Sequence, residues 1–323
     1  MDNSKKKLTL YLAPMQGLTD SFFRSVIHSC SFGHNFDLAV SPFISITHGD
    51  LSNAHKKIKD VLDTSDSMPV IPQIMGNEPK EFIDLANLLY DYGYTQIDWN
   101  LGCPLPKVAK KHHGSGLLSF PHEVEQILST VIPKIKPRLS IKMRTGYSKT
   151  EYLPLINIFN QYPLATITIH PRLGIQMYEG PIDYEAPHMI TKNSQHKIIY
   201  NGDIKSFENY RFVQNLYPTI NNFMLGRGAI ANPLIAAEIK TGKPLQPNTA
   251  KAWYTEYVEK LLSKIESLDK PDVSKINKTK EYFRYIAQHL SIDNSEITPI
   301  LQCNNLSNLN MMIKEIVAKN IVI

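Results

Sequence analysis

The stretch Gln96-Ile-Asp-Trp-Asn-Leu-Gly-Cys-Pro104 joins an apolar run to a turn that carries a thiol. Its first half has the pattern of a buried strand, and its second half places Gly102 and Pro104 on either side of Cys103. Glycine reaches backbone angles closed to other residues, and proline restricts the residue before it. The sequence therefore predicts that Cys103 points in a fixed direction where a strand ends. An isolated cysteine is more often a small buried hydrophobe, so this interpretation depends on the other strand ends.

Further short apolar or β-branched runs alternate with amphipathic segments along the chain. The predicted strands are residues 8–12, 37–41, 70–74, 96–100, 139–143, 165–169, 197–200 and 223–225, and the predicted helices include 79–92, 122–135, 151–161 and 206–216. Eight strands with intervening helices predict an α/β fold, a (β/α)8 TIM barrel, because an open doubly wound sheet usually has fewer strands. The long connection 41–69 is predicted to be a lid or a binding loop, with a mobile linker as the alternative.

The pattern changes after the last predicted strand. Beyond residue 245 only helical periodicity follows, and Trp253, Tyr257, Leu261 and Ile265 recur at the spacing of one apolar helix face. We therefore predict a barrel domain over residues 1–245, followed by a C-terminal all-helical bundle over residues 246–323.

The composition is that of an ordinary globular protein, with 42% hydrophobic and 20% charged residues. The basic N-terminus shows no apolar leader and no run reaches membrane-spanning length, so a cytoplasmic location without membrane contact is expected. Three widely spaced cysteines favour neither a disulfide framework nor zinc binding, and the adjacent His112 and His113 would point apart. No metal site is therefore predicted.

The formal net charge of +5 is compatible with a polyanionic partner, although many proteins without one are equally basic. Basic side chains gather after Cys103 and on a predicted helix near the C-terminus. The first cluster is Lys107, Lys110, Lys111, His112 and His113, and the second is Lys275, Lys278, Lys280 and Arg284. Each cluster alone is more often a solvated face than a nucleic-acid site.

Polar side chains follow nearly every predicted strand. In a TIM barrel the functional groups come from the C-terminal ends of different strands, so a site is expected at these positions. They include Gln16, Gln73, Asn100, Cys103, Lys142, Arg144, His170, Arg172, Asn201, Asp203 and Arg227. Each has a structural alternative, such as a buried core histidine or a turn asparagine. Their joint placement favours a function.

Glycines cluster after the last two predicted strands. Gly202, Gly226 and Gly228 let backbone N–H groups approach an anion closely, and Arg227 adds a fork of donors. This combination predicts a phosphate site at the position usual for a TIM barrel. A dinucleotide-binding interpretation is weak, because Gly226-Arg-Gly228 lacks a third glycine in register and follows the last strand. A simple turn with a helix cap is the structural alternative.

Together these residues resemble the bacterial tRNA dihydrouridine synthases, FMN enzymes that reduce uridine in tRNA to 5,6-dihydrouridine. The resemblance covers nearly the whole chain and is strongest from residue 12 to residue 233. Its motifs are Asn100-Leu-Gly-Cys-Pro104, Gly114-Ser-Gly-Leu-Leu118, Ala13-Pro-Met15, Gln73-Ile-Met-Gly76, Lys142-Met-Arg-Thr-Gly146, His170-Pro-Arg172, Asn201-Gly-Asp203 and Gly226-Arg227. There are three departures. Ser41-Pro-Phe43 replaces a Thr-Glu or Ser-Glu pair of many members, and Pro171 stands where glycine or alanine is common. The segment Leu173-Gly-Ile-Gln-Met-Tyr-Glu-Gly180 also differs from the better-known bacterial members.

The resemblance implies a role for each matched residue. Cys103 would donate a proton to C5 of the uracil, opposite the hydride that reduced FMN delivers to C6, with NADPH or NADH as reductant. The implied FMN-binding residues are Pro14, Met15, Gln16, Gln73, Lys142, His170, Asn201, Gly202, Asp203, Gly226 and Arg227. The implied uridine- and tRNA-binding residues are Asn100, Arg144, Arg172, Lys107, Lys278 and Arg284. The helical tail would bind tRNA, and the protein is expected to be a monomer.

Two alternatives remain open at this point. One is another flavin barrel, which would act on a free pyrimidine such as dihydroorotate or on an enoate. Such an enzyme would need neither the basic clusters nor the helical tail. The other is an RNA-binding barrel without catalysis, and that protein would bind no flavin.

Overall fold

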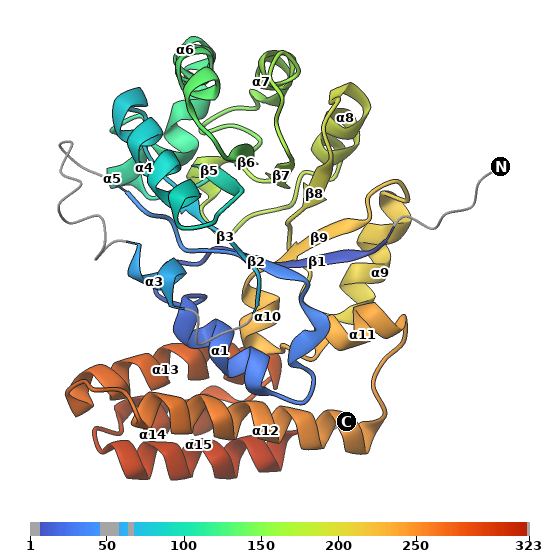
Figure 1. The fold of residues 1–323 in the computed structure, drawn as a ribbon. Helices are drawn as coiled ribbons and strands as arrows, with labels where there is room; N and C mark the ends of the chain where they lie inside the picture. Colours follow the sequence, from blue (N-terminus) through green and yellow to red (C-terminus); the bar gives the residue numbers. More distant parts are fainter. Residues whose placement is uncertain (1–6, 46–57, 64–67, 322–323) are drawn as a thin grey trace.

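Parallel strands form one sheet that curves into a barrel (Figure 1). The computed structural model describes residues 7–45, 58–63 and 68–321. The strands are β1 (Thr9–Leu12), β2 (Leu38–Val40), β3 (Val70–Ile71), β4 (Gln73–Ile74), β5 (Gln96–Leu101), β6 (Arg138–Arg144), β7 (Ile167–His170), β8 (Ile198–Tyr200) and β9 (Asn222–Leu225). Their order is β3-β2-β1-β9-β8-β7-β6-β5-β4, so the two edge strands are neighbours in the sequence. The predicted TIM barrel is confirmed.

The edge strands β3 and β4 are the two halves of one predicted strand, residues 70–74. Pro72 lies between them and has no N–H to donate to a ladder. Its carbonyl oxygen accepts a hydrogen bond from the N–H of Asp98, 2.9 Å away. The first half pairs with β2 and the second half with β5. One proline therefore divides a predicted strand in two, and the same segment joins both edges of the sheet.

Helices cover the outside of the barrel in the connections between strands (Figure 1). The α-helices of this part are α1 (Ser21–Ser29), α3 (Lys59–Leu62), α4 (Pro79–Asp91), α5 (Pro106–Ala109), α6 (Pro121–Val131), α7 (Tyr152–Phe159), α8 (Glu185–Asn193), α9 (Phe207–Leu216), α10 (Arg227–Ala231) and α11 (Ile235–Thr241). Short 3-10 helices are η1 (Gly33–Asn35), η3 (Gly114–Ser119), η4 (Ile132–Lys134) and η5 (Gly174–Gln176). The predicted helices are confirmed with small shifts in their bounds, and Ser206 caps α9 by accepting from the N–H of Asn209.

Most of the connection predicted as a lid or binding loop, residues 41–69, lies outside the described residues. Its described parts include α3 and an isolated parallel bridge between Ile44 and Ile74. The prediction of a lid therefore stays untested.

Two hydrophobic clusters occupy the two faces of the sheet. The larger one fills the space between sheet and helices and includes Leu10 and Leu12. The smaller one lies inside the barrel and consists of Tyr11, Ala13, Val40, Ile71, Ile199 and Met224. Successive strand residues point to opposite faces, which explains this alternation. The rest of the interior is polar, because Gln73, Asp98, Ser140 and Thr168 follow the same face by their strand register and are at most 1% exposed.

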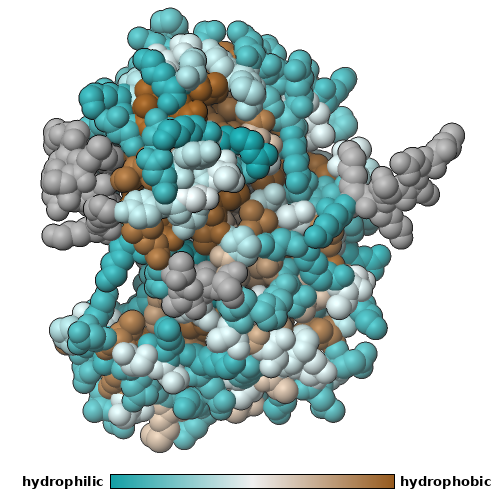
Figure 2. Space-filling view, in the orientation of Figure 1, coloured by the Kyte–Doolittle hydropathy of each residue, from teal (hydrophilic) through white to brown (hydrophobic). Residues whose placement is uncertain are grey.

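The chain after the barrel folds into α12 (Pro247–Glu266), α13 (Asp272–His289), α14 (Asn294–Gln302) and α15 (Leu306–Asn320). These helices form a layer on one side of the barrel, where α12 contacts α1 and α13 contacts α10 (Figure 1). The predicted all-helical tail is confirmed, whereas its division from the barrel at residue 245 as a separate domain stays a prediction. Hydrophilic residues dominate the visible surface of this layer (Figure 2). Among the described residues, no helix combines the length and apolarity that crossing a membrane requires.

Candidate active site

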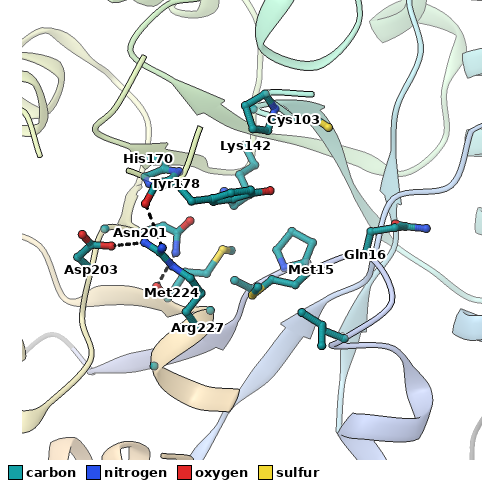
Figure 3. Close-up of a pocket in the computed structure, with 18 of the residues that line it drawn as sticks. Met15, Gln16, Cys103, Lys142, His170, Tyr178, Asn201, Asp203, Met224 and Arg227 are labelled. Atoms are coloured by element: carbon teal, nitrogen blue, oxygen red, sulfur yellow. Dashed lines mark hydrogen bonds and ion pairs between the residues drawn. The ribbon is translucent and has the colours of Figure 1, made fainter. Parts of the chain in front are cut away.

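The C-terminal ends of the strands surround a cavity of about 520 Å³ (Figure 3). Residues at or after the ends of β1, β5, β6, β7, β8 and β9 line it, and α13 adds a wall from the tail. The predicted site residues in this lining are Pro14, Met15, Gln16, Asn100, Cys103, Lys142, Arg144, His170, Asn201, Gly202, Asp203, Gly226 and Arg227. The fold therefore gathers residues that are far apart in the sequence.

Two of the predicted site residues lie behind the lining rather than in it. Gln73 is 0% exposed inside the barrel, and its side-chain amide bonds to Asp98 and Asn100. Arg172 is 4% exposed and holds Asp203 from the protein side. Direct ligand contact by Gln73 and Arg172 stays a prediction. In this structure each contacts a neighbour that lines the cavity, Asn100 for Gln73 and Asp203 for Arg172.

Three basic residues predicted to bind tRNA, Lys107, Lys278 and Arg284, lie outside the cavity lining. Lys107 on α5 and Arg284 on α13 are exposed. Lys278, also on α13, is only 18% exposed, because its ammonium lies 4.5 Å from the centre of the Phe22 ring and 3.6 Å from a carboxylate oxygen of Asp20. Lys278 therefore joins the tail to the barrel, and its contact with tRNA stays a prediction.

The turn that carries Cys103 is held from both sides. Asn100 Oδ1 accepts hydrogen bonds from the backbone N–H groups of Gly102, at 3.0 Å, and Cys103, at 2.8 Å. The carbonyl oxygen of Cys103 accepts from the N–H and the hydroxyl of Ser115, at 3.0 and 2.9 Å. Gly114 has φ +55°, and a Cβ there would lie 2.8 Å from the Cβ of Cys103. This position therefore requires glycine, and the backbone that carries the thiol is held on both sides. A fixed direction of the thiol itself stays a prediction.

Burial controls the protonation of the cavity residues. It raises the pKa of the Cys103 thiol, and the backbone of Leu105 and the charges of Arg144 and Lys142 oppose this effect without cancelling it. Cys103 is therefore a protonated thiol at neutral pH. Burial and the neighbouring Arg144 lower the pKa of Lys142 from 10.5 to about 8. The same two causes hold the pKa of His170 well below its usual value, so its imidazole is neutral.

Arg144 was predicted to contact substrate. In the structure its guanidinium donates hydrogen bonds to the backbone of two loops. The side chain is 1% exposed and donates to the carbonyl oxygens of Gly102, at 3.0 Å, Leu173, at 2.7 Å, and Met177. These bonds tie the Cys103 turn to the segment after β7. A contact of Arg144 with substrate stays a prediction, whereas its role in ordering two cavity loops is observed.

An acidic side chain links two arginines at the far end of the cavity from Cys103. Asp203 forms ion pairs with Arg172 and with Arg227, whose Nη2 is 2.6 Å from Asp203 Oδ1 (Figure 3). Burial alone would raise the pKa of Asp203, but the hydrogen bond and charge of Arg172 lower it below its usual value. Close by, a Cβ at Gly228 would lie 2.2 Å from the Ile204 carbonyl oxygen. Close packing of the backbone against Ile204 therefore requires glycine at position 228, and the phosphate site stays a prediction.

Several lining residues escaped the sequence analysis. The ring of Tyr178 extends into the cavity, with the guanidinium carbons of Arg144 and Arg227 each 5.7 Å from its centre (Figure 3). Tyr178 follows a strand end, so its place in the segment after β7 was a signal that could have found it. Tyr285 and Gln288 come from α13. No local pattern marks them, because the tail reaches the cavity through tertiary packing alone.

The two adjacent histidines after Cys103 have protein partners. The His112 ring stacks on Phe120 with centroids 3.9 Å apart, and its Nδ1 lies 3.1 Å from the carboxylate of Glu123. His113 Nε2 lies 2.7 Å from Asn77 Oδ1. Across residues 7–45, 58–63 and 68–321, no cluster of three or more His, Cys, Asp or Glu side chains is arranged to hold a metal ion.

Comparison with known proteins agrees with this geometry. The family model described as "Dihydrouridine synthase (Dus)" matches residues 11–299. The chain belongs to the dihydrouridine synthase family. This confirms the resemblance to that family, and it makes the chain an oxidoreductase whose activity is the synthesis of dihydrouridine.

Two bacterial enzymes are among the relatives of this dihydrouridine synthase. It is 33% identical to tRNA-dihydrouridine synthase B of Pasteurella multocida over 70% of this chain and 67% of that one. It is 29% identical to tRNA-dihydrouridine(16) synthase of Neisseria meningitidis over 80% and 81% of the two chains. Among solved structures, the old yellow enzyme homologue from Zymomonas mobilis matches with a TM-score of 0.51 at 12% identity, over 73% of this chain and 89% of that one. This last likeness shows the barrel fold.

Proposed function

We propose that this dihydrouridine synthase reduces specific uridines in tRNA to 5,6-dihydrouridine, with FMN in the cavity and NADPH or NADH as the reductant. The observation that carries the proposal is the presence of a thiol, Cys103, and a partly buried ammonium, Lys142, in the wall of one cavity, where burial raises the pKa of the thiol. The family and its tRNA-modifying relatives support the substrate. Action as a monomer in the cytoplasm is part of the same proposal.

The cavity fits a flavin mononucleotide in size and in chemistry. Its volume of about 520 Å³ falls within the range of about 300–1,000 Å³ that is common for cofactor sites. Ala13 and Met15 supply an apolar wall, and Gly226 and Arg227 supply the donors for a phosphate at the other end. Among the described residues no carboxylate forms an ion pair with Lys142, so its charge is available to a ligand. When bound, FMN would supply the hydride that side chains cannot provide.

Four residues of the cavity lining would bind and orient the ligands or supply the proton. Lys142 places positive charge beside the ring system, where negative charge develops on reduction. Neutral His170 offers a hydrogen bond without adding charge. Asn100 uses Oδ1 on two backbone N–H groups and one Nδ2 hydrogen on Gln73, which leaves one N–H for a uracil carbonyl oxygen. Cys103 holds the proton that goes to C5 of the uracil.

A uridine in tRNA must leave its stack to reach this cavity, at a cost of a few kcal/mol. Contacts with the phosphate backbone offset that cost. Lys107, Lys110 and Lys111 are exposed and follow Leu105, which lines the cavity. We therefore assign backbone contact to this basic segment rather than to Lys278.

The test uses the purified holoenzyme, tRNA that lacks dihydrouridine, and the Cys103→Ala variant. The variant should bind FMN and accept electrons from NADPH as the parent does, while dihydrouridine formation falls by about 100-fold or more because general acid catalysis is lost. Cys303→Ala, which removes a partly buried thiol in the tail, is the control and should keep full activity. Near-parental turnover by Cys103→Ala would exclude this thiol as the proton donor.

A parallel assay with free uracil and orotate separates the proposed enzyme from a barrel that acts on free pyrimidines. We expect turnover with tRNA only. A purified protein without flavin absorbance, or one that reduces free orotate faster than tRNA, would contradict the proposal.

A further inference from the structure

A chain of hydrogen bonds runs through the barrel interior from Asp98 to the backbone of Cys103. Gln73 Nε2 donates to Asp98 Oδ2 at 2.8 Å, and Asn100 Nδ2 donates to Gln73 Oε1 at 2.7 Å. Asn100 Oδ1 then accepts from the N–H groups of Gly102 and Cys103. Asp98 is 1% exposed and Gln73 is 0% exposed, so water does not substitute for any of these bonds. The proposed chemistry uses Cys103 but assigns no role to Asp98.

The donor-to-acceptor direction of these hydrogen bonds is determined at both ends of the series. Two backbone N–H groups need an acceptor, so Asn100 must turn its oxygen toward Cys103 and its amino group toward Gln73. Gln73 must then present its oxygen to Asn100 and its amino group to residue 98. Asp98 has an oxygen that accepts there. A side chain without an acceptor would leave the Gln73 amino group buried and unpaired, which favours rotation of the amide.

The bonds at the second oxygen of Asp98 can also be satisfied by an uncharged group. Asp98 Oδ1 and the Ile97 carbonyl oxygen both lie 2.9 Å from Ser140 Oγ, whose single hydrogen can satisfy only one of them. A protonated Asp98 would donate to Ser140 and let Ser140 donate to Ile97. An amide at position 98 reproduces that arrangement, because its NH₂ replaces the carboxyl O–H and its oxygen still accepts from Gln73.

We propose that Asp98 is a positioning residue, which accepts a hydrogen bond from Gln73 and thereby orients the Gln73 and Asn100 amides that hold the Cys103 turn. The hydrogen bonds connect three neighbouring strands to the thiol, since Gln73 pairs with Asp98 across β4 and β5 and Ser140 pairs with Asp98 across β5 and β6. The inference rests on the proposed function for its catalytic consequence, but not for its geometry.

The first test is the pH profile of Cys103 alkylation by iodoacetamide, in the purified protein with Cys303→Ser to remove the other partly exposed thiol. Asp98→Leu should relax the turn and expose Cys103, which removes part of the burial that raises its pKa. We expect alkylation at pH 7 to become about ten-fold faster, which corresponds to a fall of about one unit in the thiol pKa. Asp98→Asn should keep the parental profile.

Thr168→Val is the matched control for loss of a buried polar group. Thr168 is 1% exposed and lies on the interior face of β7, but it belongs to none of the bonds in this chain. It should leave the alkylation profile unchanged. If Asp98→Leu does not fold, Gln73→Met breaks the same chain one residue further on and should give the same acceleration.

The second test measures the reduction of bound flavin and the tRNA-dependent step separately. In Asp98→Leu, reduction of bound flavin by NADPH should stay within about two-fold, while the tRNA-dependent step slows by about 100-fold through misplacement of the thiol. Parental alkylation in both Asp98→Leu and Gln73→Met would overturn the inference, as would an Asp98→Asn profile equal to that of Asp98→Leu. Faster alkylation with an unchanged tRNA step would support the positioning role and contradict the proposed use of Cys103.

Discussion

Tyr282 of α13 donates its hydroxyl hydrogen to the carbonyl oxygen of Leu18, 2.6 Å away, and so ties the tail to the loop that follows β1. Tyr257 of α12 makes the equivalent bond to the Ile230 carbonyl oxygen in α10, at 2.7 Å. Both tyrosines are 0% exposed. Leu18 itself lines the cavity, so the tail supports the cavity wall in addition to contributing Tyr285 to it.

Tyr282→Phe should lower the free energy of unfolding by about 1 kcal/mol, because the ring packing remains while a buried carbonyl loses its donor. Urea unfolding followed by circular dichroism measures the change. Tyr90→Phe is the control, since Tyr90 is 40% exposed and its hydroxyl can bond to water. An equal loss of stability in both variants would show that the Leu18 contact contributes nothing specific.

Arg144→Lys should destabilise the protein by about 2 kcal/mol, because an ammonium cannot serve three separate carbonyl oxygens in the way that a guanidinium does. The segment around Leu173 and Met177 should also become a site of limited proteolysis, since it loses two of its anchors. Arg138→Lys, on the exposed start of β6, is the control and should change neither property. Unchanged proteolysis in Arg144→Lys would contradict the role of this side chain in ordering the loop.

The barrel could be predicted from the sequence because each strand has a recognisable local pattern of residues. In residues 139–143 and 165–169 apolar side chains occupy every second position, and polar residues follow each run. The observed β6 and β7 lie where these runs indicate. The division at Pro72 could have been read from the same information, since proline lacks the donor that a ladder needs. The packing of α13 against α10 could not be predicted, because no local feature of either sequence indicates which helix it contacts.

The site was predictable to the extent that it depends on strand exits. Cys103, Lys142 and His170 each lie within two residues of the C-terminal end of a strand, and the barrel brings them to one cavity. The burial of side chains that do not line the cavity was not predictable. Lys280 looked like part of a basic face but is 9% exposed, and Gln73 looked like a ligand contact but bonds to Asp98. In both cases a neighbouring strand or helix, distant in the sequence, decides what the side chain contacts.

Lys142→Met should stabilise the flavin-free protein at pH 7, by about 2 kcal/mol, because it removes a charge that burial disfavours. The pKa of Lys142 is about 8 in the folded chain against 10.5 for a free lysine. Between these values the unfolded chain binds more protons, so the parent gains stability as pH rises from 8 to 10.5. The advantage of the variant should therefore shrink over that range.

Thermal unfolding of parent and variant at pH 7, 9 and 10.5 measures this effect on Lys142. Lys134→Met, which replaces an exposed lysine, should show no such pH dependence. A gap between parent and Lys142→Met that stays constant with pH would mean that burial does not penalise the Lys142 charge. The variant should also lose activity, since the same ammonium serves the bound ring system in the proposed mechanism.

Replacing Lys107 and Lys110 together by alanine should weaken tRNA binding and make it less sensitive to salt. Each lost phosphate contact reduces the slope of log binding constant against log salt by about 0.7 to 0.9. Lys278→Ala should leave the slope unchanged and lower thermal stability instead, because Lys278 contacts Asp20 and the Phe22 ring. Fluorescence anisotropy with labelled tRNA at several salt concentrations distinguishes the two surfaces. A slope reduced by Lys278→Ala but not by the double variant would move the tRNA contact from the segment after Cys103 to α13.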